Sequence, residues 1–216
     1  MPGKQPTIQN FIASMSQAKG FARTSKYAVI ITPPSNLATD VLVNQNNQMR
    51  FNNNVNRQVN LHCNSVSLPG HDLQAQDVQH GSAPGRQMVT SHDYAGTIAA
   101  SFYLDSHLRE RLFFEQWQQM AVSNTTHKAN YYDDYIGTME IFQLDGNGEI
   151  TYGIKATEVY PTTLAGIEYA YANTNQIALQ AVQFQYRQWF NMTADAIAGY
   201  SGSNLFDLEL QSYGYR

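Results

Sequence analysis

The sequence predicts a mainly β fold: a barrel-like or sandwich-like subunit with one packed central α-helix, an N-terminal helix and extended arms. Three observations support this fold class. Short segments with apolar residues at every second position recur along the chain, one interior segment has strong helical spacing, and no regular alternation of strands and helices is present. With 216 residues, 43% of them hydrophobic, the chain has enough apolar side chains for a core.

The first two predicted elements are a helix at about 6–18 and a strand at 25–32. The helix is predicted from apolar residues at helical spacing, namely Ile8, Phe11, Ile12 and Met15. The strand SKYAVIIT ends at Pro33 and Pro34, since proline cannot donate a ladder hydrogen bond. The segment 33–58 that follows is rich in amides, and we expect either a long loop or an exposed hairpin arm.

The middle of the chain predicts further strands and the central helix. Residues 59–70 form a predicted strand that ends in Leu-Pro-Gly, and residues 86–104 form one long strand or two short ones. Ser106 is the expected N-cap of the helix HLRERLFFEQWQQMAV. Its apolar residues lie on one broad face: Leu108, Leu112, Phe113, Trp117, Met120 and Ala121.

Two β segments follow the central helix. The segments YIGTMEIFQL and EITYGIKATEVY flank Asp145-Gly146-Asn147-Gly148, which predicts a hairpin. The last predicted strand is QAVQFQYRQW at 180–189, preceded by a loop around 169–175. Residues 191–216, rich in Gly, Ser and Tyr, are predicted to be a C-terminal extension to a single domain at 1–190.

The strand at 180–189 has two different faces. Val182, Phe184 and Tyr186 share one face, which we expect to pack against the central helix. Gln183 and Gln185 share the other face with Arg187. We expect this second face to meet a lumen or a neighbouring layer of protein, and we expect a carboxylate to pair with Arg187.

Charge is scarce and unevenly distributed. Charged residues make up 14% of the chain, whereas about a quarter is typical. Residues 1–60 contain six Lys or Arg against one acid, and residues 130–210 contain two against ten. A basic front and an acidic back suit a subunit that meets copies of itself head to tail, although the charges could also intermingle in the fold.

The sequence predicts no catalytic, cofactor-binding or metal site. Ser91, His92 and Asp93 cannot form a hydrolase triad, because consecutive residues of a strand point to opposite faces. The six histidines have no metal-ligand spacing, and the run from Asp145 to Glu149 lacks the glycine of a calcium loop. No run approaches the roughly 18 apolar residues of a membrane span.

The tyrosines of the acidic half do not indicate nucleic-acid binding. Base-stacking aromatics are expected among Lys and Arg, but these tyrosines lie among Asp and Glu. We expect packing or subunit contacts from Tyr131, Tyr132, Tyr135, Tyr169 and Tyr171.

Over residues 6–190, the ordered set of elements resembles the tail-tube proteins of contractile-tailed bacteriophages. The parts that carry this resemblance are the N-terminal helix before the strand at 26–31, the strand ending in Ser67-Leu68-Pro69-Gly70, the strand-to-helix run at 101–121, the hairpin ending in Glu158-Val159-Tyr160-Pro161, and the strand ending in Tyr186-Arg187-Gln188-Trp189. The segments 33–58 and 190–216 depart from the shorter members of the family.

The resemblance implies a structural virion protein without enzymatic activity. Six subunits would form a ring whose sheets join into an inner barrel, and stacked rings would make a hollow tube for DNA ejection inside a contractile sheath. Implied partners are the sheath, baseplate and tape-measure proteins, with no tight DNA binding and no cofactor. The implied location is the phage tail, after assembly in the host cytoplasm. Two alternatives remain open: a baseplate tube initiator and a β-sandwich carbohydrate-binding module.

Overall fold

The computed structural model describes residues 7–17, 20–35, 37, 53–94, 96–172 and 176–192. The elements in chain order are α1 (Ile8–Gln17), β1 (Tyr27–Thr32), α3 (Asn53–Leu61), β2 (Cys63–Val66), β3 (Asp72–Val78), β4 (Arg86–Asp93), β5 (Ile98–Tyr103), α4 (Arg109–Ala121), α5 (Tyr132–Tyr135), β6 (Gly137–Leu144), β7 (Ile150–Leu164), β8 (Leu179–Gln185) and β9 (Gln188–Asn191). The mainly β fold with few helices is therefore confirmed.

The chain divides into two compact units. One comprises Met1–Ala28, Ile141–Ile154 and Asn191–Arg216, and the other comprises Val29–Glu140 and Lys155–Phe190. The second unit contains α4, β5 and β8 together with strands β3 and β4.

The main sheet has the strand order β1-β6-β7-β8-β5-β2, and β9 pairs with β7. The β2–β5, β5–β8 and β7–β8 pairs are antiparallel. Within the described strands, β1 and β2 are the two ends of this path. Among the described strands, β1 and β2 are therefore the edge strands of the sheet.

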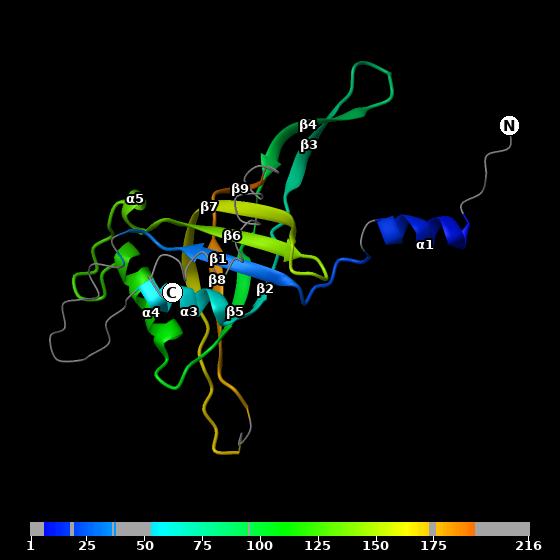
Figure 1. The fold of residues 1–216 in the computed structure, drawn as a ribbon. Coiled ribbons are helices and arrows are strands. Elements are labelled where there is room, and N and C mark those ends of the chain that lie inside the picture. The colour runs from blue at the N-terminus through cyan, green and yellow to red at the C-terminus, as the bar shows by residue number, and fades with distance from the viewer. Residues whose placement is uncertain are drawn as a thin grey trace. The chain divides into compact units, whose positions relative to one another are not determined.

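A second, two-stranded sheet consists of β3 and β4 alone. These strands pair antiparallel from Asp72 opposite Asp93 to Val78 opposite Arg86, with a bulge between Gln74 and Ala75. Figure 1 shows the pair projecting beyond β5 and β8 as an arm. We refer to residues 71–93 as the arm.

The core of the second unit lies between α4 and the main sheet. Phe114 packs on Phe102 of β5 at a ring-centroid distance of 4.9 Å and on Phe184 of β8 at 5.7 Å. Trp117 lies 6.3 Å from Phe184 and donates its indole N–H to the carbonyl of Tyr135 at 2.7 Å. The expected contact between the apolar face of β8 and the central helix is confirmed.

Gly137 lets β6 approach Trp117 closely. A Cβ atom at this position would meet the carbonyl oxygen of Thr32 and would lie 2.8 Å from an indole carbon of Trp117. A side chain at this position would displace either the backbone of β1 or a fully buried ring.

Several predicted boundaries are wrong. Residues 53–61 are helical, although we expected a loop or arm up to 58 and a strand from 59. Val59 is fully buried, and the side chain of Asn60 accepts a hydrogen bond from the backbone N–H of Ile31 at 3.0 Å, so tertiary contacts stabilise this helix. The expectations for 38–52 and 193–216 lie outside the described residues.

The predicted N-cap of α4 is also wrong. The helix begins at Arg109, and the carboxylate of Asp105 accepts hydrogen bonds from the backbone N–H groups of His107 and Arg109, at 2.9 and 3.0 Å. Asp105 rather than Ser106 satisfies these donors, and its negative charge suits a helix N-terminus.

Two strands differ from expectation as well. Strand β3 was not predicted, and the strand expected at 180–189 is interrupted at Tyr186 and Arg187 before β9. The hairpin at Asp145–Gly148 is confirmed, since the Asp145 carboxylate accepts hydrogen bonds from the N–H groups of Asn147 and Glu149 at 2.7 and 2.9 Å.

Candidate functional site

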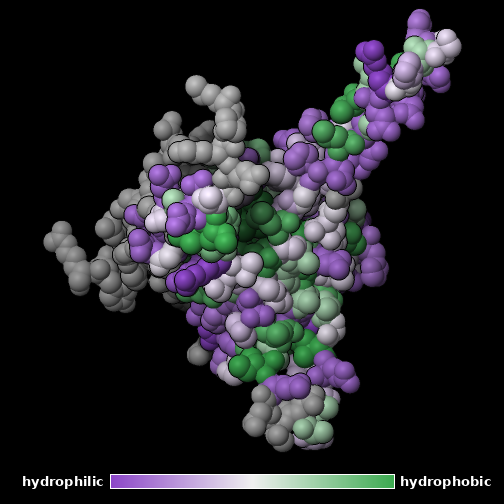
Figure 2. Space-filling view, turned by 90° about the vertical axis from the view of Figure 1, so that its right-hand side faces the viewer, coloured by the Kyte–Doolittle hydropathy of each residue, from purple (hydrophilic) through white to green (hydrophobic). Residues whose placement is uncertain are grey.

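The arm has no core of its own. Every residue of β3 is exposed, and every residue of β4 is exposed except the half-buried Asp93. Its large apolar side chains are accessible to solvent, including Leu73 at 52% and Val89 at 59% exposure. In Figure 2 the arm carries a few hydrophobic patches on a mainly hydrophilic surface. An isolated two-stranded hairpin is marginally stable in water, so this element is suited to being covered by another protein.

A cluster of rings fixes the base of the arm. His71 lies 5.9 Å from Tyr94 and 5.2 Å from Trp189, and His92 lies 6.0 Å from His71. The indole N–H of Trp189 donates to the carbonyl of Gly70 at 3.1 Å. These contacts hold the first residues of the arm against the end of the main sheet, while the rest of the arm projects outward.

The exposed face of β2, β5 and β8 carries no charged side chain within the described strands. In the strand register, Gln183 lies opposite Ala99 of β5 and Thr163 of β7. Ser101 lies opposite Ala181 of β8 and Ser65 of β2. The hydroxyl groups of Ser65 and Ser101 lie 2.7 Å apart. We call this surface the uncharged sheet face: Ser65, Ala99, Ser101, Tyr103, Thr163, Leu179, Ala181 and Gln183. The polar side chains on this face are all neutral.

Arg187 has the carboxylate partner that the sequence analysis expected. Its guanidinium donates to Glu158 Oε1 at 2.8 Å, although Arg187 itself is largely exposed. The pKa of Glu158 is lowered, first by this hydrogen bond and also by one with Tyr132. The pKa of Tyr132 is raised to about 12, because of desolvation and then the nearby Glu158 carboxylate.

Glu158 has an unusual backbone conformation for a strand residue. Its φ angle is 55°, in the left-handed region, where non-glycine residues are uncommon. The backbone N–H of Arg187 donates to the carbonyl of Thr157 at 3.1 Å, so the irregularity in β7 lies opposite the interruption between β8 and β9. The ion pair therefore links two irregular points of neighbouring strands.

Three tyrosines pack beside this pair. The rings of Tyr132, Tyr135 and Tyr160 lie edge to face at centroid distances of 5.3 to 6.4 Å. Tyr131 is 86% exposed, and Tyr169 and Tyr171 are exposed on the β7–β8 loop. The predicted packing role is therefore observed for Tyr132 and Tyr135, while a role in subunit contacts stays a prediction for the exposed tyrosines.

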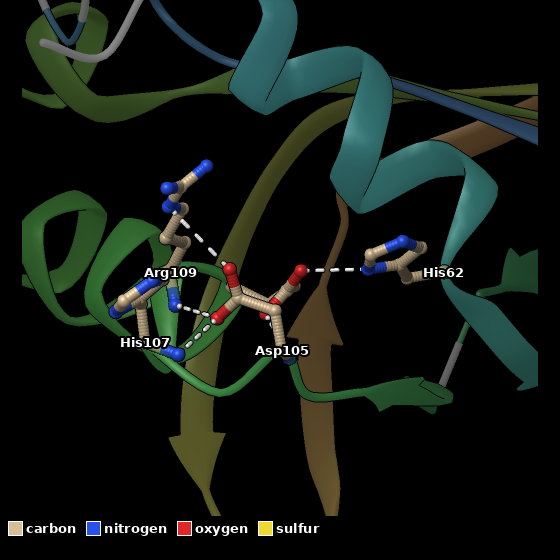
Figure 3. Close-up of polar contacts among 5 residues, drawn as sticks. His62, Asp105, His107 and Arg109 are labelled. Atoms are coloured by element: carbon tan, nitrogen blue, oxygen red, sulfur yellow. Dashed lines mark hydrogen bonds and ion pairs between the residues drawn. The ribbon is translucent and has the colours of Figure 1, made fainter. Parts of the chain in front are cut away.

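A buried carboxylate of α4 contacts His62, the residue between α3 and β2, and sequence reasoning did not find it (Figure 3). Glu110 is 1% exposed and accepts a hydrogen bond from Asp105 N–H at 3.0 Å. Its other oxygen lies 2.7 Å from Nδ1 of His62. His62 immediately precedes β2, so this contact positions an edge strand of the sheet. The only sequence signal for this contact was a glutamate in the first turn of the central helix.

Within the described residues, no group of three or more His, Cys, Asp or Glu side chains is arranged to hold a metal ion. Ser91, His92 and Asp93 are consecutive on β4, and His92 and Asp93 pair with different residues of β3. An open groove between α4 and β7 contains one carboxylate, Glu115, which is bound to Arg111 at 2.7 Å.

No described helix has both the length and the apolar character needed to cross a bilayer.

Comparisons with known proteins agree on the kind of fold. The sequence family described as phage tail tube protein matches residues 22–192. One similar solved structure is of an extracellular contractile injection system, the PVC sheath–tube complex in the extended state. It has a TM-score of 0.54 at 13% identity, covering 83% of this chain and 97% of the other.

A second similar solved structure is of the sheath/tube terminator of the PVC extracellular contractile injection system in the extended state. Its TM-score is 0.52 at 12% identity, covering 79% of this chain and 96% of the other. At these identities the likeness shows the fold. No curated protein matches the sequence.

Proposed function

The chain belongs to the phage tail tube protein family, and we propose that it is the main subunit of a tube built from stacked six-membered rings. The tube would lie inside a contractile sheath in the phage tail and would conduct DNA during ejection. The protein would act structurally, without catalysis. Its implied partners are further copies of itself, the sheath, and the baseplate and tape-measure proteins, and assembly would take place in the host cytoplasm.

The single observation that carries this proposal is the exposed arm. Its strands bury almost nothing in the isolated chain, yet they carry Leu73, Val78, Met88 and Val89 in solvent. A two-stranded element of this kind gains stability when a partner covers it. In a tube, a neighbouring copy supplies that cover at every position except the ends.

Two further features support a ring with a central conduit. Strands β1 and β2 are the two ends of the described strand path, which is where a neighbouring sheet would pair. The uncharged sheet face suits a conduit for DNA, because Lys and Arg contacts to phosphates add affinity through counterion release. Neutral Gln, Ser and Thr side chains keep such a surface wet without holding the phosphates.

The test is negative-stain electron microscopy of the purified protein. We expect rings or tubes at high concentration or on addition of a baseplate seed. A species that stays monomeric under both conditions would contradict the proposed function.

An arm variant makes the same test specific. Leu73→Asp with Val89→Asp places two charges on the arm, so we expect the chain to fold and tube formation to be lost. Thr125→Asp, at an exposed turn after α4, is the matched control and should assemble like the unmodified protein. If both variants assemble equally well, the arm is not part of the interface.

A further inference from the structure

Helix α1 presents an apolar stripe to solvent. Ile8, Phe11 and Ile12 lie at positions i, i+3 and i+4, and they are 79%, 55% and 60% exposed. None of the ten described residues of α1 is buried, and none is charged. A helix of this length is marginal in water without tertiary packing, and none of the described residues buries the stripe, so it is suited to docking on another surface.

The end of α1 extends this stripe. Gly20 has a φ angle of 99° and donates its N–H to the carbonyl of Met15 at 2.9 Å. Phe21 follows it and lies at a ring-centroid distance of 6.3 Å from Phe11. Phe21 is itself exposed, so four large apolar side chains of residues 8–21 face solvent together.

This element precedes the part of the chain that matches the tail tube family, which begins at residue 22. It is therefore a feature of this chain beyond the matched segment.

The charges around α1 are opposite in sign to those of the arm. The chain around α1 carries Lys4, Lys19, Arg23 and Lys26, and no acid precedes Asp40. The arm carries three aspartates, Asp72, Asp77 and Asp93, against one arginine, Arg86. The helix region is basic with an apolar stripe, and the arm is acidic with exposed apolar side chains.

We propose that α1 of one copy docks on the β3–β4 arm of the neighbouring copy, an inference that rests on the proposed tube assembly. The apolar side chains of each element would cover those of the other, and the basic flanks of α1 would lie beside the aspartates of the arm. The contact joins two different surfaces, so it is heterologous and repeats from copy to copy in one direction.

Each copy contributes one helix and one arm, so both elements are covered throughout an assembly except at its ends. Leu73 and Val89 are the expected centre of the docking surface. Val89 pairs with Ala75, and Ala75 is two residues from Leu73 on the same strand, so both side chains share one face of the arm.

Cysteine cross-linking between two differently tagged full-length chains tests this contact. Both chains carry Cys63→Ser, one adds Ile12→Cys, and the other adds either Leu73→Cys or Val89→Cys. After co-assembly and mild oxidation, we expect a disulfide-linked heterodimer from at least one pair, because a disulfide needs Cα atoms about 4.4–6.8 Å apart. Asn10→Cys lies on the opposite side of α1 and is the matched control, with little cross-linking expected.

Charge reversal provides a second, independent readout. Arg23→Glu and Asp77→Arg should each raise the concentration needed for assembly about two- to five-fold, and the double variant should recover most of that loss. Losses that add in the double variant would contradict the pairing of these two surfaces.

The outcomes separate this inference from the proposed function. Tubes that form normally while neither Ile12→Cys pair cross-links above the Asn10→Cys control would overturn the docking of α1 and leave the tube intact. Binding of α1 to vesicles of anionic lipid in place of cross-linking would also overturn it. If the unmodified chain forms no tubes with or without a seed, the proposed function itself is contradicted.

Discussion

Strands β8 and β3 are each seven residues long, but they differ in what lies across from them. In β8, Gln180, Val182 and Phe184 are buried under α4 and alternate with more exposed residues, whereas all seven residues of β3 are exposed. The sheet beneath α4 is stabilised within one chain. Among the described strands, β3 pairs with β4 alone, and ring contacts hold the arm at its base, so its exposed strands gain stability when another surface covers them.

The largest expected effect is in the sheet region. Phe114→Ala removes a fully buried ring that contacts Phe102 and Phe184, and we expect a loss of about 3–5 kcal/mol in the free energy of unfolding. Urea denaturation of the unassembled protein measures it. Phe114→Leu keeps much of the volume and should lose clearly less; a loss below about 1 kcal/mol for the alanine variant would contradict an internally stabilised sheet.

A pair of glycines compares the two regions directly. Gly137→Ala forces a Cβ atom against Thr32 and Trp117, so we expect a loss of about 1–3 kcal/mol in unfolding free energy. Gly85→Ala, in the turn of the arm, meets no atom within 4 Å and is the control. Thermal unfolding of both variants measures the contrast, and equal melting temperatures would show that β6 tolerates the added methyl group.

The ion pair at the irregular end of the sheet should make a smaller, pH-dependent contribution. Arg187 lowers the pKa of Glu158, so the pair stabilises the fold above the unfolded-state pKa, about 4.3, and this increment is lost as pH falls through the lower folded-state pKa. The Glu158→Gln variant lacks this pH-dependent stabilisation, because the glutamine side chain carries no charge.

Denaturant unfolding of both proteins from about pH 6 to about pH 2 measures the difference. The unmodified protein should be the more stable at the higher pH, and the two curves should converge in acid. A difference that stays constant across this range would exclude the carboxylate as its source.

The smallest effect on the isolated chain is expected in the arm. Leu73→Ala with Val89→Ala removes only exposed apolar groups, so we expect the unfolding free energy of the monomer to change by no more than about 0.5 kcal/mol per site. Sedimentation should nevertheless show weaker assembly. A large loss of monomer stability would mean that the arm is packed within its own chain.

Sequence periodicity was most informative where each strand has one buried face. Val182, Phe184 and Tyr186 lie in the core as predicted, because alternate residues of a strand necessarily share a face. The turn at Asp145–Gly148 was equally predictable, because its hydrogen bonds are local and are made by the aspartate itself.

Periodicity failed where contacts distant in sequence choose the conformation. The segment that begins at Val59 was compatible with a strand, but burial of Val59 and the hydrogen bond from Ile31 to Asn60 favour the end of a helix. Strand β3 has little apolar alternation, and its conformation depends on pairing with β4. Neither signal is present in the local sequence.

The sequence by itself determined the mainly β fold class, the two faces of β8, the position of the main helix and the need of Arg187 for a carboxylate. Only the tertiary structure decided that Glu158 is that carboxylate, that Glu110 is buried beside His62, and that β3 and β4 leave the sheet as an exposed arm. The physical reason is that side-chain periodicity follows from local backbone geometry, whereas partners and burial depend on residues brought together by the fold.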